Sequence, residues 1–103
     1  MALDWDEAKR AANRVKHGID FASVGQFEWD AALVRADMRI SYGEVRLVAL
    51  GRIERVLHVL IFTVERRVVR IISLRRANRK EVRSYAEQQA AEESSDEPPL
   101  ADR

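Results

Sequence analysis

The sequence predicts an α+β fold: two N-terminal helices packed on a four-stranded antiparallel sheet, followed by a C-terminal helix. Apolar residues recur at helical spacing before residue 28 and again after Asn78, whereas residues 33–74 carry four runs rich in Val, Leu and Ile. Only short polar connections separate these runs, and short connections usually join antiparallel strands. With 103 residues the chain has the length of one domain with a single modest core.

The first helix is predicted over residues 6–17. Asp4 and Glu7 stand in a capping relation at its start, and Gly18 suits the left-handed position after its end. Small apolar residues recur three or four positions apart along it, so we expect them to lie buried against the sheet: Ala8, Ala11, Ala12 and Val15.

A second, shorter helix is predicted to start at Asp20, whose side chain suits an N-cap. Phe21, Val24 and Phe27 then face inward, although Gly25 weakens the helix.

Four strands and their connections follow from the apolar runs. The strands are predicted at residues 33–38, 45–50, 56–64 and 68–74, with a turn at 41–43, a polar connection at 51–55 and a hairpin at 65–67.

The C-terminal helix is predicted to begin after Asn78, a good N-cap, with Glu81 placed to reach back to the cap N–H. Val82 and Tyr85 continue its apolar spacing. We expect one domain over residues 1–89. Residues 90–103, rich in acids and Ser with two Pro, are expected to form a disordered acidic tail.

Charge is distributed unevenly along the chain. Residues 52–83 carry a net charge of +7, and residues 84–103 carry a net charge of −5. Nine of the ten cations in the basic segment are arginines, whose forked donors suit phosphate and carboxylate. The segment indicates a polyanionic partner, and the alternative is a solvated arginine-rich face.

Composition also excludes several classes of site. The chain has no cysteine and only two histidines, without paired ligand spacing, so we expect no metal and no cofactor. No apolar leader or membrane-length run occurs, so we expect a cytoplasmic protein without membrane contact.

Two separated motifs resemble one family. Trp5-Asp6, Lys9, Asn13, Lys16-His17-Gly18-Ile19 and Phe21 match the pattern W-D-x-x-K-x-x-x-N-x-x-K-H-G-I-x-F. Arg70-Ile71-Ile72-Ser73, then Arg75, Ala77, Arg79, Glu81 and Tyr85, are similar to the same family's C-terminal half. Over about residues 3–88 the chain therefore resembles BrnT toxins of type II toxin–antitoxin systems.

This resemblance implies a RelE-like ribonuclease fold and an endoribonuclease that inhibits translation and growth. It also implies a BrnA-like ribbon-helix-helix antitoxin, operator DNA bound through that antitoxin, and a toxin dimer within a heterotetramer. One departure concerns the hairpin after Thr63, where the family pattern T-x-R-G is absent and Glu65 stands where an Arg is expected. Either Arg66 takes over that role or the activity of this copy is weakened.

Metal-free RNA cleavage by a 2′-hydroxyl requires a proton acceptor, a proton donor and cations near the phosphate. The candidate catalytic residues supply these groups: Arg70, Arg66, Arg79, His58 and Glu65. The candidate RNA-binding residues are cations of the basic segment and of the first motif, with Arg79 in both candidate sets: Arg75, Arg76, Arg79, Lys80, Lys16 and His17.

The sequence leaves two other functions open. One is a non-catalytic nucleic-acid-binding or co-repressor subunit, an inactivated toxin. The other is a structural subunit whose arginines only hold acidic residues of a partner. His58, within an apolar strand, also has a plain structural interpretation as a core residue.

Overall fold

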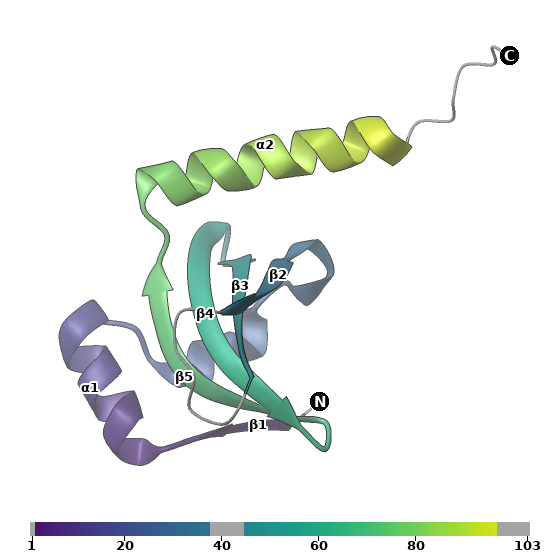
Figure 1. Ribbon diagram of the computed structural model, residues 1–103. Coiled ribbons are helices and arrows are strands. Elements are labelled where there is room, and N and C mark those ends of the chain that lie inside the picture. Colours follow the sequence, from purple (N-terminus) through teal and green to yellow (C-terminus); the bar gives the residue numbers. More distant parts are fainter. Residues whose placement is uncertain (1, 38–44, 97–103) are drawn as a thin grey trace, which may run out of the picture.

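The protein, described by a computed structural model at residues 2–37 and 45–96, has one sheet, two helices and two short 3-10 segments (Figure 1). The strands are β1 (Ala2–Trp5), β2 (Leu33–Asp37), β3 (Arg46–Ile53), β4 (Val56–Glu65) and β5 (Val68–Arg76). The helices are α1 (Glu7–His17) and α2 (Arg79–Asp96), and the 3-10 segments are η1 (Phe21–Gln26) and η2 (Trp29–Ala31).

The sheet has the order β1-β5-β4-β3-β2, with β1 parallel to β5 and the other pairs antiparallel. The prediction of a four-stranded antiparallel sheet was therefore wrong. β1 pairs with a strand more than sixty residues away, with Ala2 opposite Val68 and Trp5 opposite Ile71. Its four residues are too few for a period-two pattern to stand out, and the sequence analysis assigned them no element, using Asp4 only as a helix cap.

Two helices before the sheet were also predicted, and only α1 is an α-helix. Asp20 does cap the next segment by accepting a hydrogen bond from Ala22 N at 2.9 Å, but η1 is a six-residue 3-10 helix. Short 3-10 turns need no long run of good helix formers, and Gly25 lowers the helical preference here. Phe21, Val24 and Phe27 are buried as expected.

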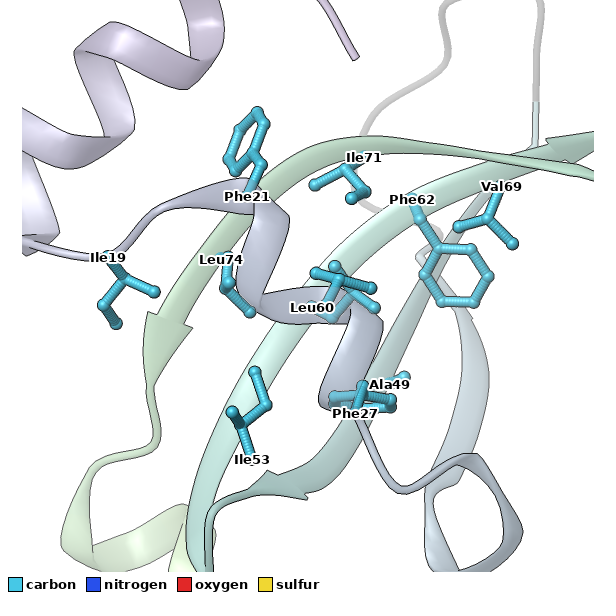
Figure 2. Close-up of a cluster of buried hydrophobic side chains, with 11 residues drawn as sticks. Ile19, Phe21, Phe27, Ala49, Ile53, Leu60, Phe62, Val69, Ile71 and Leu74 are labelled. Carbon is cyan, nitrogen blue, oxygen red and sulfur yellow. The ribbon is translucent and has the colours of Figure 1, made fainter. Parts of the chain in front are cut away.

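The core lies on one face of the sheet, between the sheet and η1 (Figure 2). Gly51 faces this core, and a Cβ there would come within 2.4 Å of the Phe27 ring, so only glycine allows the ring to lie against β3. The cluster joins the segment after α1 to three strands: Ile19, Phe21, Val24, Phe27, Ala49, Ile53, Leu60, Phe62, Val69, Ile71 and Leu74.

α1 lies beside β5 with an orientation that the periodicity did not predict (Figure 1). Its N-cap is Asp6 rather than Asp4, and its only buried residue is Asn13. Val15, expected in the core with the alanines, is 89% exposed. Gly18 ends the helix in the left-handed conformation, with φ 71°, as predicted.

The strands agree with the prediction except at their ends. β3 continues to Ile53, so the expected polar connection at 51–55 is a two-residue turn, Glu54-Arg55. That turn and Arg66-Arg67 have positive φ at both residues, as type I′ hairpins require. The predicted turn at 41–43 lies outside the described residues.

α2 begins as the sequence predicts. Asn78 Oδ1 accepts from Glu81 N, and Glu81 accepts from Asn78 N, each at 2.8 Å, which completes the capping box. The helix continues to Asp96, beyond the expected domain end at 89, through residues that favour helix. The tail prediction for residues 97–103 lies outside the described part of the chain. Neither described helix could span a bilayer.

Candidate functional site

The second face of the sheet forms the floor of a groove. Side chains alternate along a strand, so the residues between core positions of β3 and β4 point away from η1. A groove of about 860 Å³ separates this face from the first turns of α2. Its floor is apolar, with Val48, Leu50, Val59 and Ile61, and its α2 wall is polar, with Lys80, Glu81, Ser84 and Gln88.

Cations from three elements line this groove: Arg35 on β2, Arg75 on β5 and Lys80 on α2. Two acids, Asp37 and Glu81, lie among them. Arg35 belongs to no motif, and the sequence analysis did not select it. The period-two alternation of β2 is the signal that could have placed it on the same face as the groove floor.

Arg75 is held in position by α2. Its two terminal nitrogens donate to the two Glu81 carboxylate oxygens, both at 2.8 Å. This forked ion pair is the main reason that the pKa of Glu81 lies below its usual value, and the nearby charge of Arg35 also lowers it. This ion pair therefore links β5 to α2 at the groove, and the negative charge of Glu81 partly offsets the positive charge of Arg75.

A second, smaller pocket of about 280 Å³ lies between α1 and β5. α1 contributes Lys9, Lys16 and His17, while Arg46 comes from β3 and Ser73 from β5. Burial lowers the pKa of His17, and the positive charges of Lys16 and then Arg75 lower it further. Arg75, which lines the groove, and Ser73, which lines this pocket, are two residues apart on β5, so the two cavities lie on neighbouring parts of that strand.

Arg70 lies on the groove face but at its far end. It pairs in register with Thr63 of β4 and Asp4 of β1, and its guanidinium forms an ion pair with the Asp4 carboxylate. Both side chains are about half exposed, 47% and 50%. Arg70 thus ties the edge strand β1 to the sheet and lines neither cavity.

His58 lies on the core face, opposite to the groove. It is buried, and its Nδ1 lies 2.7 Å from the carbonyl oxygen of Val56. Because a carbonyl can only accept, Nδ1 carries the proton and donates. This geometry agrees with the plain structural interpretation of His58.

The remaining candidates lie at opposite ends of the sheet. Glu65 and Arg66 occupy the exposed hairpin before β5, whereas Arg76, the last residue of β5, and Arg79 are exposed at its other end. The nine residues of β5 separate these ends by about 25 Å. The structure therefore places Arg75 and Lys80 at the groove and Lys16 and His17 at the smaller pocket, and it does not bring the five candidate catalytic residues together.

Tyr85 attaches the groove wall to the body of the protein. Its hydroxyl donates to the carbonyl oxygen of Ala31 at 2.7 Å, and Gln89 donates to the same oxygen at 3.0 Å. The Arg52 guanidinium lies 5.0 Å from the centre of the Tyr85 ring. These contacts hold α2 over one end of the sheet. In Figure 1, α2 starts just past the C-terminal end of β5.

Among residues 2–37 and 45–96, no three His, Cys, Asp or Glu gather as a group that could hold a metal ion. The groove combines guanidinium and ammonium groups with the carboxylates of Asp37 and Glu81, whereas the pocket combines guanidinium, ammonium, imidazole and hydroxyl groups.

Comparison with known proteins identifies the family. No curated protein matches the chain. The family model described as the ribonuclease toxin BrnT of type II toxin–antitoxin systems matches residues 5–81, which include α1, the whole of β2 to β5 and the start of α2. The chain belongs to the BrnT family of ribonuclease toxins.

Proposed function

We propose that this chain is a metal-independent endoribonuclease that binds RNA in the groove between the sheet and α2. The observation that carries the proposal is the groove's composition, an apolar floor bordered by Arg35, Arg75 and Lys80. Proteins bind single-stranded nucleic acid by cations that contact the phosphates and by side chains, most often aromatic, on which the bases pack. Here the described lining offers the cations, and aliphatic side chains in place of aromatic ones.

The reaction centre in this proposal is the junction of the groove with the smaller pocket. His17 has a lowered pKa, so its imidazole is neutral at neutral pH and can take the proton of a ribose 2′-hydroxyl. The 2′-oxygen attacks phosphorus, and Arg75 and Lys80 stabilise the charge that develops on the phosphoryl oxygens. The bond to the 5′-oxygen breaks and that oxygen takes a proton from solvent, which leaves a 2′,3′-cyclic phosphate and a 5′-hydroxyl.

The candidate catalytic residues contribute unequally under this proposal. Arg79 is exposed in the first turn of α2, between the groove residues Asn78 and Lys80 in sequence, and extends the phosphate-binding surface. Arg76 lies opposite His58 in the β4–β5 register, on the core face, and takes no part in the groove. Arg70, His58 and the Glu65-Arg66 hairpin lie outside both cavities and take no part in the reaction.

The proposal is tested by cleavage of an RNA oligonucleotide with purified protein in the presence of EDTA. We expect cleavage with a 2′,3′-cyclic end, and a rate that falls as the pH drops through a pKa below 6.5, the ordinary value for His. His17→Gln should lower the rate about 100-fold or more and abolish this pH dependence. Cleavage that requires a divalent cation, or an unchanged rate in His17→Gln, would contradict the mechanism.

The partner in this proposal is a BrnA-like ribbon-helix-helix antitoxin, in a heterotetramer that binds operator DNA through the antitoxin. Membership of a type II toxin family supports an antitoxin partner and an effect on translation and growth. Induction of this chain alone should arrest growth, and coexpression of the antitoxin should relieve the arrest. Unaffected growth with abundant soluble protein would count against a toxic activity.

One observation favours a second function, a non-catalytic nucleic-acid-binding subunit. Glu81 occupies both terminal nitrogens of Arg75, which reduces the positive charge available to a phosphate. RNA binding that weakens steeply as salt rises, without any cleavage, would identify this alternative.

A further inference from the structure

α1 turns its polar side toward the protein and its apolar side toward solvent. Asn13 is its only buried residue, and Val15 on the opposite side is 89% exposed. Burial of apolar surface favours the reverse orientation. A local pattern that the fold does not follow is a common mark of a functional site.

The inward face of α1 carries cations. Lys9, Lys16 and His17 lie three or four residues from Asn13, so they share its face of the helix. Asn13 fixes this face against β5 through hydrogen bonds to Leu74 and Ile19. The orientation that exposes the alanines is therefore the one that directs these three side chains to the pocket.

The pocket has a uniform chemical character. Arg46 and Ser73 complete its polar lining, and no Asp or Glu lies among the described residues that line it. None of its lining residues also lines the groove. Ammonium, guanidinium and hydroxyl donors from three elements favour a tetrahedral oxyanion.

The spacing along β5 relates the pocket to the groove. Ser73 of the pocket and Arg75 of the groove are two residues apart and face the same side, opposite Ile61 and Val59. Side chains with this spacing are about 7 Å apart, a separation similar to that of consecutive phosphates in an extended strand. An RNA strand held at Arg75 would therefore bring its next phosphate to the pocket.

We propose that the pocket between α1 and β5 is a subsite for the phosphate adjacent to the scissile one. This inference rests on the proposed ribonuclease function, and it makes a flanking phosphate part of the substrate that the enzyme recognises. Lys16 and Lys9 are its phosphate-binding residues, with Arg46 and Ser73 beside them.

Binding can be tested without any cleavage. Inorganic phosphate titrated into the protein should shift the backbone amide NMR signals of His17 and Ser73 and reach saturation. Lys16→Ala should weaken this binding at least fivefold. Arg14→Ala removes the same charge from an exposed position of α1 that does not line the pocket, and it should change the affinity less than twofold. Equal effects of the two substitutions would overturn the proposal.

Cleavage of modified RNA tests the position of the subsite. In one RNA substrate, a neutral methylphosphonate replaces the phosphodiester next to the scissile one. This change should lower kcat/KM about tenfold for the unsubstituted protein and should not change kcat/KM for the Lys16→Ala variant. An equal loss in both proteins would overturn the subsite. If the protein binds inorganic phosphate through Lys16 but cleaves no RNA, the proposed ribonuclease function is overturned. The bound phosphate would then not be part of an RNA substrate.

Discussion

At the scale of single residues, Asn13 determines how α1 lies on the sheet. Its amide nitrogen donates to the carbonyl oxygens of Ile19 (3.1 Å) and Leu74 (2.8 Å), and its oxygen accepts from Leu74 N (3.2 Å). These backbone groups are buried and have no water to replace the side chain. The family motif includes Asn13, but helical periodicity alone assigns it to the solvent side.

Asn13→Ala should lower the free energy of unfolding by about 2–4 kcal/mol, because it leaves buried backbone groups without partners. Urea denaturation measures this loss. Val15→Ala on the same helix is the control, with an expected change below about 0.5 kcal/mol because Val15 is 89% exposed. A larger loss for Val15 than for Asn13 would show that the helix is oriented as the periodicity first suggested.

Asp20 gives the fold a pH dependence at strongly acidic pH. The Arg10 guanidinium donates to both its carboxylate oxygens at 2.9 Å and, with Ala22 N, lowers the pKa of Asp20 from 3.8 to about 2. The unfolded chain therefore binds this proton more readily than the folded one. The stabilisation is complete above the unfolded pKa and is lost as pH falls through the folded pKa.

Asp20→Asn tests this linkage, because it keeps an oxygen that can accept from Ala22 N but removes the charge. The variant should unfold at lower urea concentration than the natural sequence at pH 7. The two midpoints should converge toward pH 2. A difference that persists unchanged at pH 2 would mean that the charge of Asp20 does not stabilise the fold.

At the scale of elements, the two tight hairpins are strained. Glu54 and Arg55 have φ of 49° and 72°, and Arg66 and Arg67 have φ of 53° and 67°. Residues with a Cβ avoid this region, whereas Asn-Gly occupies it readily. Residue type alone gave no turn signal at Glu54-Arg55, which is why β3 was predicted to end before Gly51.

The double substitution Glu54→Asn with Arg55→Gly should raise the free energy of unfolding by about 1 kcal/mol, since it relieves both left-handed residues. Thermal or urea unfolding measures the gain. The control is Glu54→Ala with Arg55→Ala, which removes the same side chains but keeps a Cβ at both positions of positive φ. It should not raise the free energy of unfolding. Equal stability of the two variants would contradict the assignment of strain to this turn.

At the scale of the whole molecule, short-range patterns predicted the central strands and the C-terminal helix. Alternation and apolar runs located β2 to β5, and the capping box located the start of α2. The parallel pairing of β1 with β5 depends on contacts across more than sixty residues, which no local pattern encodes. The orientation of α1 depends on Asn13, whose buried hydrogen bonds outweigh the apolar stripe.

The candidate site was predictable to a similar extent. The motifs selected Arg75, Lys16 and His17, and the basic segment selected Lys80. Arg75 and Lys80 line the groove, and Lys16 and His17 line the smaller pocket. No motif includes Arg35, which reaches the groove through strand alternation, and Arg46 reaches the pocket from the start of β3, opposite Asp37 in register. The departure from the family's T-x-R-G pattern led to Arg66, which the sheet holds far from the groove.

The measurement that tests the account most directly compares RNA cleavage by two double variants. Arg35→Ala with Lys80→Ala removes two charges from the groove, whereas Arg66→Asn with Arg67→Gly removes two from the distant hairpin and suits its turn. We expect the groove variant to lose about 100-fold in kcat/KM and the hairpin variant to change less than about threefold. A large loss in the hairpin variant with full activity in the groove variant would contradict the proposal that RNA is bound and cleaved in the groove.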